Sequence, residues 1–371
     1  MRIIPIECIR DGSFLGKTIY DDSGRVLLKK GAELTDAILN KVKELQMLSL
    51  YILDEYSEGE VDDIIKPELR QKTIAILKGT FANISRFNSV NNIDVTNRKV
   101  TKQDLEYFQA INSIAEELLE NILSNKNILV NLVDIKSMDN YTYQHCVNVA
   151  ILSLIMGIGL KLPKRALINL CVGALVHDIG KVFVSKEITN KKGPLTSDEY
   201  GLMKEHPKKG YDYLSKYYEL NSVCKIITLQ HHERVDGGGY PEGLNQDKIN
   251  YLSKIVSIAD VYDALTSDRS YRRALCASDA LEYIMANVGS MFDYEMVTIF
   301  TKLIVPFPFG TIVRLSNGDI GIVQETPVSY PLRPTIKIVK SSNHESEGDC
   351  ISLVHELSLV ISGIEYNLEK E

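Results

Sequence analysis

Residues 166–181 read ALINLCVGALVHDIGK, an apolar segment that ends in charged groups. Its leucines and alanines recur at helical spacing, so the segment predicts a buried helix that carries its polar chemistry at the C-terminal end. That end holds His177, Asp178 and Lys181. A buried carboxylate beside an imidazole is costly unless a cation or hydrogen bonds compensate it. The segment therefore predicts that further ligands come from elsewhere in the chain.

Candidate ligands occur on other apolar helical stretches. His145 lies upstream, and His206, the pair His231-His232, and Asp260 lie downstream. Each histidine alone has an ordinary interpretation as a core or capping residue, but the set as a whole indicates a metal centre. Imidazoles and carboxylates without thiolates suit iron, manganese, nickel or zinc in an open catalytic site.

The two oxygens of Asp178 allow it to bridge two ions while His177 binds one of them. Two ions roughly 3.5–4 Å apart are the usual arrangement for hydrolysing a phosphodiester, since together they activate the nucleophile and neutralise the phosphate. We therefore expect two divalent metal ions, iron or manganese first, with zinc and nickel as alternatives.

Composition bounds the class of protein. The chain has 371 residues, a formal net charge of −7 and six scattered cysteines without a CxxC pair. The negative charge argues against binding to long nucleic acid or to anionic membranes. The cysteine pattern suits reduced thiols, and we read no signal peptide, so we expect a cytoplasmic location. The apolar run 146–160 falls short of the roughly 20 residues that a membrane span needs, so we expect a core helix there.

Periodicity predicts a mainly α protein with a small α+β N-terminal module and a small β C-terminal module. The expected domains are an accessory module, a helical linker region, a central domain and a β module, at residues 1–60, 66–130, 131–303 and 306–371.

The accessory module should contain strands at 17–20, 26–28 and 51–53, and a helix capped by Thr35. The linker region should contain two helices separated by an Asn-rich break at 85–97, with Thr101 and Asp104 as a capping pair for the second helix. Two interpretations of these helices stay open. They pack on the central domain, or residues 66–125 form a homodimer seam.

The central domain should be helical apart from an irregular excursion at 182–195, after which Thr196 and Glu199 form a capping box. In the β module, Asn317-Gly318 predicts a hairpin, followed by strands at 335–339, 351–354 and 357–361.

Three ordered motifs carry a family resemblance. They are the pair His177-Asp178, the run HHERVDGGGYP at 231–241, and the run IADVYDALTSDRSYR at 258–272. The chain resembles the HD-GYP family of bacterial cyclic-di-GMP phosphodiesterases, a branch of the HD superfamily of metal-dependent phosphohydrolases. The match covers about residues 135–300. It implies an all-helical HD-type core and hydrolysis of cyclic-di-GMP to linear pGpG, and slowly on to GMP.

The resemblance implies two ligand sets that share Asp178. The first ion would be bound by His145, His177, Asp178 and Asp260, and the second by Asp178, His206, His231 and His232. It also implies that Lys181 lies over the scissile phosphate. The expected substrate-binding residues are Lys191, Gly239, Tyr240, Asp263, Arg269 and Arg272.

Some of these positions have alternatives. Asp263 could instead orient a metal ligand or be a capping residue, and Arg269 and Arg272 could be a solvated surface cluster. Some relatives look trinuclear, with a glutamate four residues before the first histidine ligand. Tyr141 stands there in this chain, so we expect two ions and not three.

Two alternative functions remain open. The substrate could be 3′,3′-cyclic GMP-AMP or another nucleotide, since no residue in the sequence identifies which base the site would prefer. The chain could also be a nucleotide-binding signalling module without turnover, although the complete ligand set argues against this.

Overall fold

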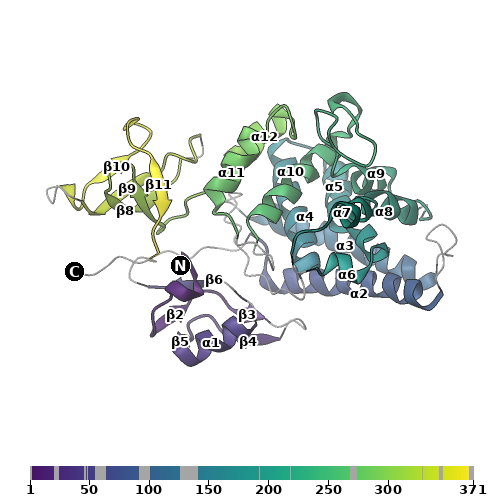
Figure 1. The fold of residues 1–371 in the computed structure, drawn as a ribbon, viewed down its shortest axis with the longest axis horizontal. Helices are drawn as coiled ribbons and strands as arrows, with labels where there is room; N and C mark the ends of the chain where they lie inside the picture. Colours follow the sequence, from purple (N-terminus) through teal and green to yellow (C-terminus); the bar gives the residue numbers. More distant parts are fainter. Residues whose placement is uncertain are drawn as a thin grey trace.

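The computed structural model describes residues 2–20, 25–45, 47, 49–54, 64–91, 101–125, 141–191, 193–217, 219–267, 274–327, 329–341 and 346–366. Figure 1 shows a large helical part, an N-terminal α+β part and a C-terminal β part. This arrangement confirms the predicted fold class.

The N-terminal module is a four-stranded sheet in the order β1-β6-β2-β5, with a separate ribbon of β3 and β4. Its elements are β1 (Arg2–Pro5), η1 (Ile6–Cys8), β2 (Ser13–Leu15), β3 (Ile19–Tyr20), β4 (Val26–Leu28), β5 (Glu33–Leu34), α1 (Asp36–Glu44) and β6 (Ser49–Leu53). The helix begins after Thr35 as predicted, but the Thr35 side chain makes no capping hydrogen bond. The strand expected at 17–20 is shorter, and three further strands, β1, β2 and β5, were not expected.

Two long helices follow, α2 (Pro67–Asn91) and α3 (Lys102–Ser124). The capping box at the start of α3 is confirmed, because Thr101 Oγ1 accepts from the Asp104 amide at 3.2 Å and Asp104 accepts from the Thr101 amide at 2.9 Å. The break expected from residue 85 is wrong in its first part, since α2 continues to Asn91.

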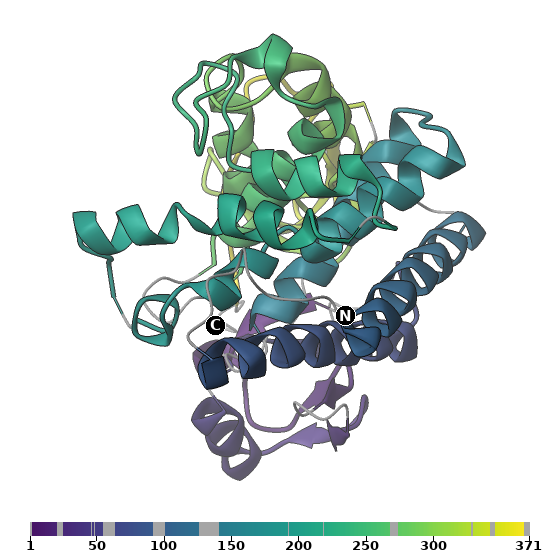
Figure 2. The same ribbon diagram turned by 90° about the vertical axis from the view of Figure 1, so that its right-hand side faces the viewer.

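The apolar stripes of α2 and α3 are buried against the other helices, and Figure 2 shows both helices lying along one side of them. One hydrophobic cluster includes buried residues from Ile64 to Ile304, so packing draws no boundary near residue 130. The stripes are thus covered within one chain, which favours packing on the central domain. The homodimer stays a prediction.

The remaining helices include α5, which packs against α3, α4 and α9. They are α4 (Tyr141–Gly159), α5 (Lys164–Val176), η4 (Ile179–Phe183), α6 (Lys186–Thr189), α7 (Ser197–Met203), α8 (His206–Leu214), α9 (Ser222–Gln230), η5 (Gln246–Lys248), α10 (Tyr251–Leu265), α11 (Ala277–Ala286) and α12 (Tyr294–Leu303). Helix α5 is buried from Leu170 to Val176, as its sequence predicts. The excursion at 182–195 is not irregular throughout, because α6 lies within it. The capping box of Thr196 and Glu199 is confirmed.

Two segments are long and apolar enough to cross a membrane, Thr142–Gly159 and Lys164–Phe183. Their windows are 72% and 67% buried inside the protein. Since the same surface cannot face both lipid and the protein core, these segments fit core helices.

The C-terminal module is a five-stranded sheet in the order β10-β9-β8-β7-β11. Its strands are β7 (Ile312–Leu315), β8 (Ile320–Glu325), β9 (Thr335–Lys340), β10 (Cys350–Ser352) and β11 (Ile361–Ile364). The hairpin at Asn317-Gly318 joins β7 and β8, and Gly318 has the positive φ of 91° that favours glycine.

The last two predicted strands are displaced along the chain. Residues 357–360 form no strand, and β11 begins only at Ile361. The Arg333 guanidinium donates to the carbonyls of Leu353 at 3.2 Å and Leu359 at 2.9 Å. These bonds hold the segment between them in turns, which hydrophobic alternation cannot reveal.

Candidate metal centre

Five parts of the helical fold deliver the seven predicted ligands to one place. They are His145 in α4, His177 and Asp178 after α5, His206 at the start of α8, His231 and His232 after α9, and Asp260 in α10. Two groups have ligand atoms within 4.8 Å of one another: His145 with His177 and Asp260, and His206 with His231 and His232. Except for His232, the ligands are buried.

Three of the histidines are oriented in the same way. The Nδ1 atoms of His177, His206 and His231 lie 2.7, 2.7 and 2.8 Å from the backbone carbonyl three residues earlier. Carbonyls in the last turn of a helix lack an intrahelical partner, so they accept from Nδ1–H. Each bond fixes the tautomer that leaves a lone pair on Nε2, and these nitrogens converge on the centre.

Asp178 lies between the two groups. Its Oδ1 is 3.3 Å from His206 Nε2, and its Oδ2 is 3.5 Å from His177 Nε2 and 3.8 Å from His145 Nε2. One carboxylate oxygen therefore faces each group, which is the geometry that a bridging ligand requires.

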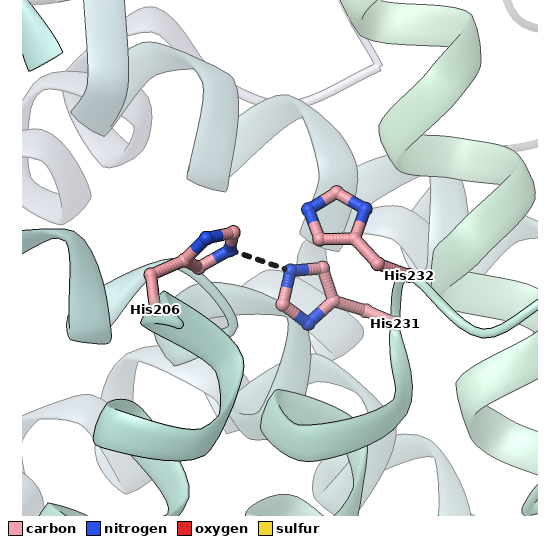
Figure 3. Close-up of side chains that lie close together, drawn as sticks. All are labelled: His206, His231 and His232. Atoms are coloured by element: carbon pink, nitrogen blue, oxygen red, sulfur yellow. Dashed lines mark hydrogen bonds between the residues drawn. The ribbon is translucent and has the colours of Figure 1, made fainter. Parts of the chain in front are cut away.

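Several buried atoms in the centre lack a donor. His177 Nε2 and Asp178 Oδ1 are buried without a hydrogen-bond partner. His206 Nε2 and His231 Nε2 face each other at 3.2 Å (Figure 3), although each is a lone-pair atom when its Nδ1 donates to a carbonyl. Buried polar atoms are rarely left in this state. A cation would satisfy all of them, so the residues present fit a metal centre.

The protonation states also fit metal ligation. Burial lowers the pKa of His177 and His231, and it lowers that of His232 to about 3, so these imidazoles are neutral. Burial alone would raise the pKa of Asp178, but Lys181 and the nearby histidines outweigh burial and hold it well below its usual range. Neutral imidazoles and an ionised carboxylate are the forms that bind metal.

Cys146 lies beside His177 and Asp178 but differs from the other groups. Its thiol is fully buried, and burial together with nearby Asp178 raises its pKa well above the usual range. The thiol is therefore neutral in the absence of metal, whereas His177 and Asp178 are already in the forms that bind metal.

A glycine brings the second half of the centre into contact with the first. A Cβ added at Gly180 in η4 would lie 1.8 Å from the backbone oxygen of His206 and 2.7 Å from the amide nitrogen of Gly210. Only glycine permits this approach of η4 to α8. The approach places His206 beside Asp178.

Comparisons with known proteins agree with this geometry. Residues 117–296 match the family model described as an HD domain, and residues 312–366 match that of a KOW domain associated with HD domain. The cyclic di-GMP phosphodiesterase PA4108 of Pseudomonas aeruginosa is 37% identical over 62% of this chain and 55% of its own length. The cyclic di-GMP phosphodiesterase of Thermotoga maritima is 28% identical over 72% of this chain and 74% of its own length.

A solved structure titled as Bd1817, an HD-GYP-type protein from Bdellovibrio bacteriovorus, has the same fold. It is 18% identical, has a TM-score of 0.51, and is covered over 97% of its length by 81% of this chain. Residues 117–296 therefore form an HD domain, and the named relatives support the HD-GYP family. The chain spans about half the length of the first curated relatives that it matches.

The loop at residues 236–241, which reads DGGGYP, is held in place by Glu233. This carboxylate is buried, and its oxygens accept from the amides of Glu242 at 2.7 Å and Leu244 at 2.8 Å. A Cβ at Gly239 would lie 2.4 Å from the backbone nitrogen of Arg234. The glycine is thus required by contact with the chain's own backbone. The sequence predicts a substrate-binding role for Gly239 and no role for Glu233.

Tyr240 lies directly against the candidate HD-GYP metal centre. Its ring stacks on that of His232, with centroids 4.7 Å apart. The Lys204 ammonium lies 5.4 Å from the Tyr240 ring and 4.7 Å from the Tyr200 ring. The loop therefore presents an aromatic ring beside the candidate metal ligands, and Lys204 at the end of α7 adds a cation next to it.

Other predicted HD-GYP substrate residues are placed differently. Asp263 is buried, and its oxygens lie 2.6 Å from His145 Nδ1 and 2.9 Å from Asn148 Nδ2, which favours the ligand-orienting alternative. Lys191 donates to Glu199 Oε2 at 2.5 Å, so its contact is with the capping box of α7. Arg269 and Arg272 lie outside the described residues, as does the side chain of Tyr141.

Replacing Gly180 with alanine should destabilise the fold, because the new methyl group collides with α8 backbone that cannot move freely. We expect the free energy of unfolding in urea to fall by about 3 kcal/mol, at the upper end of typical overpacking costs. Gly201→Ala is the matched control, since a Cβ there meets nothing within 4 Å and the site is exposed on α7. Equal stabilities of the two variants would contradict the close contact.

Replacing Glu233 with glutamine should loosen the loop, because an amide NH₂ would face a backbone donor where a carboxylate oxygen now accepts. The loss of one buried bond costs about 1–3 kcal/mol. Hydrogen–deuterium exchange of residues 237–245 should quicken, while the exposed control Glu242→Gln should leave it unchanged. Unaltered exchange in Glu233→Gln would remove the bracing role.

Proposed function

We propose that the chain is a metal-dependent phosphodiesterase that hydrolyses cyclic di-GMP to linear pGpG, and slowly on to GMP. The observation that carries the proposal is Asp178, whose two oxygens face two separate groups of buried ligands. Relatives named cyclic di-GMP phosphodiesterases support the reaction type.

The proposed ligand sets divide at Asp178. His145, His177 and Asp260 would hold one ion with it, and His206, His231 and His232 would hold the other. Iron or manganese suits these nitrogen and oxygen donors, with zinc or nickel as alternatives. When bound, the two ions would activate water and neutralise the phosphate. We propose two ions and not three, since Tyr141 stands where a third carboxylate would be needed.

In the reaction, water adds across one P–O3′ bond of the cyclic diester. A new P–O bond forms, the P–O3′ bond breaks, and a proton reaches the departing 3′ oxygen. Lys181 is the chain's own cation at this place. Its ammonium lies 2.5 Å from Asp178 Oδ2, and the side chain is 31% exposed, so it can reach a phosphoryl oxygen on the open side. A charge there stabilises the transition state more than the bound substrate.

Residues on the open side would bind the rest of the dinucleotide. Tyr240 offers a ring for stacking beside His232, with Gly239 before it in the loop. Arg269 and Arg272 would pair with the two phosphates, since guanidinium groups match phosphate oxygens. Lys191 would contribute only if it leaves Glu199. We propose that the protein acts in the cytoplasm, consistent with cysteines that are free wherever the structure describes them.

A second candidate substrate is 3′,3′-cyclic GMP-AMP. A relative named 3'3'-cGAMP-specific phosphodiesterase 1 from Vibrio cholerae is 36% identical over 46% of this chain. Turnover of both dinucleotides, measured side by side with Mn²⁺ or Fe²⁺, decides between them. Binding without turnover of either would favour the non-catalytic signalling module.

Asp178→Asn should abolish hydrolysis and lower bound metal, because the amide has lost the charge and one of the two ligand oxygens. Metal analysis of the purified wild type should give two ions per chain, and the variant fewer than one. Asp198→Asn, an exposed acid in α7, is the control that should keep both. Wild-type turnover in Asp178→Asn, or three ions in the wild type, would contradict the assignment.

Lys181→Ala should keep its metal and lose turnover, because the ammonium acts on charge that develops during the reaction. We expect kcat to fall by about 100-fold or more, with a smaller change in KM. Lys186→Ala, exposed in α6, provides a control of like charge. Loss of metal in Lys181→Ala would instead mean that Lys181 mainly holds Asp178 in place.

A further inference from the structure

A line of hydrogen bonds runs from α2 into the candidate metal centre. Arg70 in α2 donates to Asn148 Oδ1 at 2.6 Å, and Asn148 Nδ2 donates to Asp263 Oδ1 at 2.9 Å. Asp263 Oδ2 lies 2.6 Å from His145 Nδ1, and His145 Nε2 lies 3.0 Å from Asp260 Oδ1. Three helices, α2, α4 and α10, therefore contribute to one ordered chain of polar groups.

The chemistry of each group fixes its direction in the line. A guanidinium can only donate, so it requires the amide oxygen of Asn148 to face α2. The NH₂ of that amide then points at Asp263, which as a carboxylate can only accept. Asn148 is 2% exposed and lies between the buried apolar residues Val147 and Val149 of α4, where an unpaired amide would be costly. The Arg70 bond thus selects the one amide orientation that supports Asp263.

His145 depends on this line in a way that other ligands do not. His177, His206 and His231 take their orientation from a backbone carbonyl on the same segment. His145 takes it from Asp263, a side chain on another helix, 118 residues away in sequence. Partners that orient a metal-binding histidine also raise its basicity, and their loss typically lowers metal affinity about 10–100-fold.

We propose that Arg70 and Asn148 are positioning residues for His145. They hold the Asp263 carboxylate so that His145 Nε2 faces the centre. Arg70 lies outside residues 117–296, the part that matches the HD domain. Helix α2, which follows the N-terminal module, is thereby a working part of one half of the centre. The inference rests on the proposed function only in assuming that the centre binds metal.

Because the line of hydrogen bonds reaches only the His145 group, substitution of Arg70 should change the Mn²⁺ affinity of one site and not of the other. A titration with Mn²⁺ measures both affinities. Metal-free full-length protein is titrated with MnCl₂ while free Mn²⁺ is followed by electron paramagnetic resonance. We expect Arg70→Ala to weaken one of the two sites about 10-fold and to leave the other within about 2-fold, because only the His145 group is affected. Asn148→Ala should weaken the same site at least as much.

A double variant tests whether Arg70 acts through Asn148. If it does, Arg70→Ala with Asn148→Ala should lose no more affinity than Asn148→Ala alone. Lys72→Ala is the matched control, because Lys72 joins α2 to α3 through Glu117 at 2.7 Å on the exposed surface. It should leave both Mn²⁺ sites unchanged.

Distinct outcomes separate this inference from the proposed function. If the wild type binds no Mn²⁺, the metal centre itself is wrong. If the wild type binds two ions and Arg70→Ala behaves like Lys72→Ala, or weakens both sites equally, the positioning role is wrong. Thermal unfolding in EDTA identifies a variant that is merely misfolded. If Arg70→Ala is misfolded, Arg70→Gln replaces it, because glutamine keeps a hydrogen-bond donor but carries no charge.

Discussion

The structure depends on a group of buried nitrogen and oxygen atoms whose lone pairs point at one another, with too few hydrogen-bond donors to satisfy them. Asp178 Oδ1 and His177 Nε2 are buried without hydrogen-bond partners, and the Nε2 atoms of His206 and His231 face one another. Such an arrangement is unfavourable in a protein interior unless positive charge enters it. The fold therefore holds these groups in place against their mutual repulsion, and a bound cation would convert the same arrangement from a cost into a source of stability.

Helix ends make this convergence achievable. A histidine just past the last turn can donate to a carbonyl that has no intrahelical partner, so one bond both satisfies the backbone and aims the ring. The fold uses this device at His177, His206 and His231. Gly180 then allows two of these helix ends to meet. The positions of these three histidines, just past the end of a helix, are thus a consequence of how they are oriented.

This relationship explains why the main helices and the convergence of the candidate ligands could be predicted from the sequence. The apolar run that ends in His177-Asp178 predicts both the buried helix and the polar groups at its end. The hairpin at Asn317-Gly318 likewise depends only on residues that are neighbours in the sequence. Contacts between distant segments were not predictable. Arg333 displaces the last strand through carbonyls 20 and 26 residues away, and Glu233 braces a loop through backbone amides. Asn148 was visible as a polar residue in an apolar helix, but its partners on α2 and α10 were not.

Helix α2, which lies before the HD domain, takes part in the same core and in the polar line. Residues 74–84 of α2 contribute to the cluster that includes α4 and α10, and Arg70 reaches Asn148 one turn earlier in that helix. A rotation or shift of α2 by a fraction of a turn would remove the guanidinium from the amide while the apolar contacts could adjust. Polar bonds with fixed direction are more sensitive to small displacements than apolar packing is. A movement of α2 would therefore be felt first at Asp263 and His145, the half of the centre whose orientation comes from side chains.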